Sequence, residues 1–144
     1  MSKELMFGVS RKFQLLSTMR KENKQVFLYA HPDEEFGCLM KTVENEHCID
    51  VTFGILTPNE KRAKEFKTFV RAKAALLKKE KNKEIVYFGK IKLISEKEWE
   101  VWNLQYHHDY IEVIKTLDMS PRTFNHIIRR IHYKKDQLQR EFSV

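Results

Sequence analysis

Hydrophobic and polar positions follow two different rhythms along the chain, which predict a first part rich in strands and a last part made of helices. Residues 26–30 (VFLYA) and 48–56 (CIDVTFGIL) are short apolar runs with β-branched and aromatic side chains, a composition typical of strands. Residues 85–94 predict a further strand or a hairpin arm, and residues 36–43 fit either a strand or a helix. The chain before residue 95 is therefore expected to form a small sheet.

Helical spacing of apolar residues occurs at two places in this first part. Residues 9–21 predict a short amphipathic helix. A longer helix is expected after Thr57, which can cap it, with Pro58 at its first position and Glu60 completing a capping box. It should end between residues 79 and 82. The basic side chains that face away from its apolar stripe are Lys61, Lys64, Lys67, Arg71 and Lys78.

Three successive helices are predicted in residues 95–144. Ser95 and Glu98 form a capping box for the first helix, and the second ends at Asp118. Ser120 caps the third helix, because proline follows it at the first helical position. The turn between the last two helices is short, which is helix-turn-helix spacing. The buried stripe of the third helix is expected to contain Phe124, Ile127, Ile128, Ile131 and Leu138.

These patterns together predict an α+β protein with a small N-terminal sheet, one long basic helix and a C-terminal three-helix unit. Of the 144 residues, 42% are hydrophobic, enough for a core, and 33% are charged. No run is long enough to cross a membrane and the N-terminus lacks the pattern of a signal peptide, so we expect no membrane contact and a cytoplasmic location. The two cysteines form no disulfide framework and imply no structural zinc.

The net charge of +7 is unevenly distributed along the chain. Residues 60–94 hold 12 basic and 4 acidic side chains, whereas residues 95–144 hold 8 of each. We interpret the lysine-rich stretch 78–83 as a solvated helix end. After Met119 no acidic residue occurs before Asp136, and such a basic stripe attracts phosphate backbones. The basic residues in this interval are Arg122, Arg129, Arg130, Lys134 and Lys135.

The stretch 93–135, roughly a third of the chain, resembles the helix-turn-helix of LuxR/GerE-type regulators and of region four of bacterial sigma factors. The resemblance implies that the third helix, residues 121–135, enters the major groove of DNA. The residues that carry it are Ser95 with Glu98, Glu100-Val101, Glu112-Val113, Leu117 and Ser120-Pro121-Arg122-Thr123-Phe124.

Position along the third helix suggests a role for each polar side chain. The first turn normally meets base edges, and later turns meet phosphates. Ser120 with its neighbouring amides could hold a phosphate at the helix N-terminus. The expected base-contacting residues are Arg122, Thr123, Asn125 and His126, and the expected phosphate-contacting residues are Arg129, Arg130, Lys134 and Lys135.

The sequence therefore predicts a sequence-specific transcription regulator that binds double-stranded DNA and is not an enzyme, with no cofactor and no metal. A homodimer is expected, because one such motif makes few contacts. Residues 95–144 would be the DNA-binding domain. Residues 1–94 would form an α/β domain for oligomerisation or for a partner, with RNA polymerase or another protein as candidates.

A rival hypothesis concerns His31-Pro32-Asp33-Glu34-Glu35, which follows the strand at 26–30. This stretch resembles the HPDDE signature of the LmbE/PIG-L zinc deacetylases. That resemblance implies that His31 and Glu34 bind zinc while Asp33 acts as general base, an arrangement suited to hydrolysis. The alternative is a turn that ends the strand, for which proline and aspartate are well suited. A protein-interaction module that never meets nucleic acid also stays open.

Overall fold

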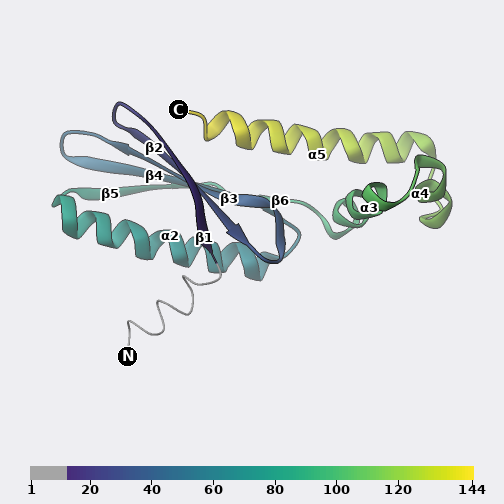
Figure 1. The fold of residues 1–144 in the computed structure, drawn as a ribbon, viewed down its shortest axis with the longest axis horizontal. Helices are drawn as coiled ribbons and strands as arrows, with labels where there is room; N and C mark the ends of the chain where they lie inside the picture. Colours follow the sequence, from purple (N-terminus) through teal and green to yellow (C-terminus); the bar gives the residue numbers. More distant parts are fainter. Residues whose placement is uncertain (1–12) are drawn as a thin grey trace.

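Residues 13–144 are described in the computed structural model of this protein, and they form the predicted α+β fold. A sheet comes first and three helices follow it (Figure 1). Strands β1 (Gln14–Lys21), β2 (Lys24–His31), β3 (Glu34–Glu44) and β4 (Cys48–Thr57) are antiparallel neighbours in chain order. Helix α2 (Glu60–Lys81) then crosses over, so that β5 (Glu84–Gly89) and β6 (Lys92–Leu93) run parallel to β4.

The helix expected at residues 9–21 is wrong within the described residues, since residues 14–21 form strand β1. The part of that prediction before residue 13 lies outside them. Its apolar residues Leu15, Leu16 and Met19 are exposed and not on a buried helix face. Pairing with β2 satisfies the backbone instead, and this tertiary partner outweighs the local pattern. Residues 36–43, which fitted either a strand or a helix, form a strand in the structure.

The start of α2 also differs from the prediction. Asn59, not Thr57, is the N-cap, and its side-chain oxygen accepts a hydrogen bond from the Arg62 amide at 3.1 Å. Thr57 is instead the last residue of β4, and its hydroxyl donates to Glu34 at 2.9 Å. The predicted end is confirmed, since α2 ends at Lys81 and Asn82 adopts a left-handed conformation.

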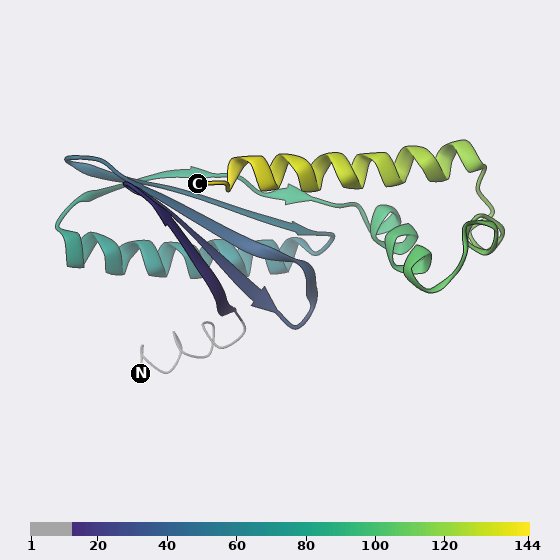
Figure 2. The same cartoon turned by 45° about the horizontal axis from the view of Figure 1, so that its top comes forward.

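The two faces of the sheet are covered by different helices (Figures 1 and 2). Helix α2 buries Phe66 and Val70 against a core that includes Met40, Phe53 and Ile55 of the sheet. On the other face, the end of α5 buries Leu138 and Phe142. The other buried residues of that second cluster are Val26 of β2, Leu56 of β4 and Ile94, which follows β6.

Helices α3 (Glu96–His107), α4 (Tyr110–Thr116) and α5 (Pro121–Glu141) follow the sheet. The capping box of Ser95 and Glu98 is confirmed, as is the Ser120 cap. Figure 2 shows α5 running from α4 back over the sheet. The third helix is thus longer than the predicted 121–135, because its last turns pack on the sheet. No helix among residues 13–144 is long and apolar enough to span a membrane.

Candidate nucleic-acid interface

A sharp corner between α4 and α5 sets the direction of the long last helix. Helix α4 ends at Thr116, two residues before the predicted end at Asp118. Asp118 adopts a left-handed conformation with φ 48°, which redirects the chain. The Met119 amide donates to the Ile114 carbonyl at 3.0 Å, and the Leu117 amide donates to the Val113 carbonyl at 3.0 Å. Backbone hydrogen bonds to α4 therefore hold the turn that leads into α5.

Beyond this corner, α5 is held by side chains of α3 and α4 that pack against it. Val101 and Trp102 of α3 and Val113 of α4 pack against the inner face of α5. On α5 the buried residues are Phe124, Ile127, Ile131 and Leu138, as predicted, while Ile128 is half-buried. The inner face of the helix is thus fully used, and its outer face is left to solvent.

The N-terminus of α5 is closed by Ser120 itself. The Ser120 hydroxyl accepts a hydrogen bond from the Thr123 amide at 3.2 Å and lies 2.9 Å from the Thr123 hydroxyl. Pro121 has no amide hydrogen. Pro121 and Thr123, two of the first three residues of the helix, therefore have no free amide hydrogen for a phosphate. The predicted role of Ser120 in phosphate binding then depends on the Arg122 amide alone.

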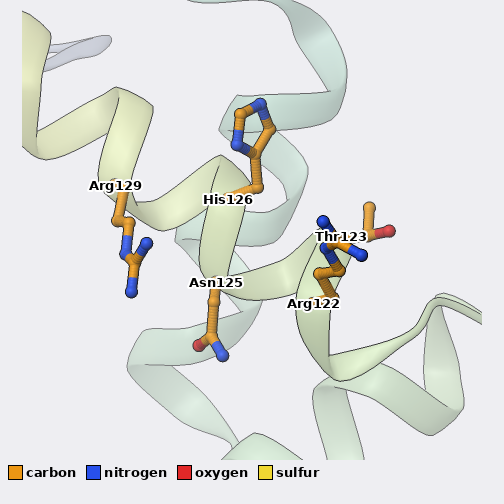
Figure 3. Close-up of a pocket in the computed structure, with 5 residues that line it drawn as sticks. All are labelled: Arg122, Thr123, Asn125, His126 and Arg129. Carbon is orange, nitrogen blue, oxygen red and sulfur yellow. The ribbon is translucent and has the colours of Figure 1, made fainter.

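The polar side chains predicted to meet base edges lie together on the outer face of α5. Five side chains line a shallow depression along its first three turns (Figure 3). All five come from α5 alone, so the depression is a feature of one helix surface and not a closed cavity. Arg130, one residue further, is exposed as well. The lining residues are Arg122, Thr123, Asn125, His126 and Arg129.

The three arginines of this surface keep their charges available. Within the described part of the chain, Arg122, Arg129 and Arg130 form no ion pair with any carboxylate. This matters because an exposed guanidinium without a partner is free to form bidentate bonds with a phosphate or with guanine. We refer to the six exposed side chains Arg122, Thr123, Asn125, His126, Arg129 and Arg130 as the α5 surface.

Lys134 and Lys135, predicted to contact phosphates, are engaged inside the protein. The Lys134 ammonium lies 3.2 Å from Glu98 Oε1 and donates to the Leu93 carbonyl at 2.7 Å. Lys135 lies over the Trp102 ring at 5.1 Å and over the Phe36 ring at 5.3 Å. Both cations hold α5 to its neighbours, so we leave them out of the candidate interface.

The carboxylate that pairs with Lys134 belongs to Glu98 and is buried. Burial alone would raise the pKa of Glu98, but hydrogen bonds from Ser95 and the Lys134 ammonium outweigh it and hold that pKa below its usual value. A carboxyl with a lowered folded-state pKa stabilises the fold above its unfolded pKa of about 4.3, and this stabilisation is lost as the pH falls through the folded value.

We predict that Glu98→Gln lowers the free energy of unfolding by about 1.5–3 kcal/mol at pH 7, the value of a hydrogen bond to a charged group. Glutamine can still complete the capping box with Ser95, so the loss reports the pairing with Lys134. Urea unfolding at pH 7 and pH 3 measures it. The difference between variant and wild type should shrink at pH 3; a difference that is the same at both pH values would contradict the ionised pair.

Tyr133 is a surface residue that the sequence reasoning missed. Its side chain is 63% exposed and lies one turn beyond Arg129 on the same side of α5. The Tyr133 hydroxyl accepts a hydrogen bond from Gln137 at 2.7 Å. The spacing of residues 122, 126, 129 and 133, which recurs every three or four residues, could have identified it. Tyr133 extends the outer face of α5 with a hydrogen-bonding aromatic side chain.

The rival site around His31 is organised by an arginine. The Arg62 guanidinium lies 2.9 Å from Asp33 Oδ2 and 3.4 Å from Glu34 Oε1, and it also pairs with Glu65 at 2.8 Å. The Asp33 amide donates to His31 Nδ1 at 3.0 Å, within the turn between β2 and β3. A guanidinium at this place repels a divalent cation, and the stretch forms the turn between β2 and β3 that was the alternative.

Two further observations concern this corner. Burial raises the pKa of the nearby Cys38 thiol to about 12. In the part of the chain that is described, no group of three or more His, Cys, Asp or Glu side chains is arranged to hold a metal ion.

Comparison of the chain with protein-family models, with curated proteins and with solved structures finds no match.

Proposed function

We propose that this protein binds double-stranded DNA by laying the α5 surface in the major groove, as a transcription regulator. The observation that carries the proposal is the α5 surface itself: three arginines that form no ion pair within residues 13–144, together with Thr123, Asn125 and His126, on one exposed helix face. Arginine and asparagine are the side chains best suited to read guanine and adenine edges. An α-helix of this kind fits a groove about 12 Å wide.

The way α5 is mounted supports the same function. A helix reads bases only if its direction is fixed relative to the DNA backbone. The first turns of α5 are held by α3 and α4, and its last turns are held by the sheet. The Lys41 ammonium also donates to the Glu141 carbonyl at 2.6 Å. The helix is thus anchored along its whole length, while the face that would meet DNA stays clear.

Two copies of the chain are proposed to act together on one DNA site. A single α5 surface offers six side chains, fewer than tight specific binding usually requires. Two-fold symmetry doubles this interface and predicts a palindromic site with half-sites about 10 base pairs apart.

We expect Arg122→Ala to weaken binding of the preferred DNA sequence by about 10-fold to 100-fold, the value of one bidentate base contact. The same variant should lose its sequence preference at one base position. Fluorescence anisotropy with labelled duplexes, each altered at one position, measures both effects.

Arg140→Ala is the matched control, because Arg140 is an exposed arginine on the last turn of the same helix, far from the α5 surface. It should leave the sequence preference unchanged. Equal losses from both substitutions, with no change of preference, would show that the arginines act only as general positive charge.

A further inference from the structure

The positive charge surplus of this protein lies away from the α5 surface. Residues 95–144 are electrically balanced, with 8 basic and 8 acidic side chains. Residues 60–94, which contain α2, hold 12 basic and only 4 acidic ones. Affinity for a polyanion depends on such local surplus. Five of these basic residues pair with carboxylates of other segments, namely Arg62, Lys81, Lys83, Lys90 and Lys92. The basic residues that remain of this surplus all lie on α2.

The basic residues of α2 form one continuous stripe. Lys64, Lys67, Arg71 and Lys78 follow one another at spacings of three, four and seven residues, so they share one side of the helix. They span about 21 Å at 1.5 Å per residue. All four are exposed, and Lys61 extends the row by one turn at its start. We call these five residues the α2 stripe.

Most acidic residues of this helix lie off the stripe. Glu65 is held by Arg62 at 2.8 Å, and Glu80 lies about 160° around the helix from Lys64. Glu60, exposed at the first position of α2, is the acidic residue on the same side as the stripe, one turn before Lys64. In the described part of the chain, Lys61, Lys64 and Lys67 form no ion pair. Lys78 approaches Glu84 at 3.4 Å, and both side chains are largely exposed. Three ammonium groups in this row therefore have no carboxylate partner among residues 13–144.

Arg71 shows how the neighbouring edge of the sheet contributes. Its guanidinium lies 5.2 Å from the centre of the Tyr87 ring on β5, and that tyrosine is partly exposed. Stacking on the ring holds the arginine in place without neutralising its charge. The fixed guanidinium of Arg71 remains able to form hydrogen bonds with a phosphate.

A phosphate backbone fits the stripe better than a membrane surface does. Double-stranded DNA carries one charge per about 1.7 Å of its axis, so a 21 Å length of duplex holds about 12 phosphates, more than the five cations of the row require. A membrane-binding helix instead needs an exposed apolar face. The apolar face of α2 is buried against the sheet, and Leu76, its exposed apolar residue, lies about 120° around the helix from Lys64.

The α2 stripe and the α5 surface lie on different sides of the molecule. Figures 1 and 2 show α2 below the sheet, with α5 above it and α3 and α4 at the far end. We propose that the α2 stripe binds the phosphates of a second nucleic-acid segment without sequence preference. One molecule then bridges two segments, one at each surface. Phosphate binding by the α2 stripe does not depend on the proposed function of the α5 surface. Only the bridging of two segments rests on that proposed function.

The test compares two triple variants of the full chain. Lys61→Gln/Lys64→Gln/Lys67→Gln removes three charges from the stripe. Arg20→Gln/Lys21→Gln/Lys24→Gln removes three equally exposed charges from the hairpin of β1 and β2. All six positions are solvent-exposed, so both proteins should fold, which circular dichroism checks.

Binding of a random-sequence duplex is first measured as a function of salt, in an Arg122→Ala/Arg129→Ala background. The stripe variant should reduce the slope of log affinity against log salt by about 2.7, since each lost phosphate contact contributes about 0.9. The hairpin variant should keep the slope of its background. Equal slopes for all three proteins would overturn the proposal, even if the α5 surface selects a DNA sequence.

Bridging is then measured as capture of a fluorescent duplex by an immobilised duplex. The wild type and the hairpin variant should capture it, and the stripe variant should lose at least about 10-fold of the signal, three phosphate contacts being removed. Capture that survives in the stripe variant would assign bridging to a dimer with two α5 surfaces and overturn the proposal. Stripe-dependent binding to phosphatidylserine vesicles without any change in duplex binding would also overturn it.

Discussion

Replacing Ile131 by alanine is expected to lower the free energy of unfolding by about 2–5 kcal/mol, the usual cost of emptying a fully buried aliphatic site. Ile131 is 0% exposed and lies at the centre of the cluster that joins α5 to α3 and α4. Its loss leaves a cavity beside Val101 and Trp102, which the other side chains of the bundle cannot fill without moving α5. Urea-induced unfolding, followed by circular dichroism, measures the change.

Ile111→Ala provides the matched control, because the same side chain on α4 is 57% exposed. An exposed substitution of this kind is expected to change stability by no more than about 0.5 kcal/mol. If the two variants were destabilised equally, the three helices would not be packed around Ile131 as described, and the direction of α5 would have to be determined again.

Gly54→Val should be comparably damaging, at about 3 kcal/mol, the upper end of what overpacking a core costs. Gly54 lies in β4 on the sheet face that α5 covers. A Cβ atom at this position would overlap Leu138 Cδ1 and approach Phe142 Cε2 to 2.9 Å. Both side chains are buried, so neither can turn into solvent. The absence of a side chain at Gly54 is therefore what lets the end of α5 rest on the sheet.

A double-mutant cycle separates this overlap from a general loss of strand stability. Leu138→Ala alone should cost about 2–5 kcal/mol, since it empties a buried site. In the double variant, alanine makes room for valine, so the combined cost should be lower than the sum by at least about 1 kcal/mol. Additive costs would mean that positions 54 and 138 do not meet, contrary to the packing of α5 on the sheet.

The helices of the last fifty residues could be predicted because their signals are local. Ser95 and Ser120 each cap a helix through contacts made within three residues, and Pro121 fits the first helical position. The buried stripe of α5 is likewise a property of its own spacing. The position of the exposed α5 surface follows from this buried stripe of α5, since a helix that buries one side exposes the opposite side to solvent.

Features that depend on distant partners could not be predicted in this way. The run at residues 14–21 is a strand because β2 pairs with it, although its own apolar spacing suggests a helix. Lys134 belongs to a basic run in the sequence. Its ammonium nevertheless donates hydrogen bonds to the carboxylate of Glu98 and to the carbonyl of Leu93, both more than thirty residues away. The carboxylates that resemble a zinc motif meet Arg62 across the fold. In each case a contact with a residue distant in the sequence determines the structure or role that the local pattern alone predicts wrongly.

Selection of bound duplexes from a random pool shows whether the α5 surface reads DNA. The wild type should enrich one common sequence, palindromic if two copies bind, and Arg122→Ala should enrich a sequence relaxed at one position in each half-site. A pool that stays random for the wild type, or that yields the same sequence with Arg122→Ala, Asn125→Ala and Arg129→Ala combined, would contradict this reading of DNA by the α5 surface.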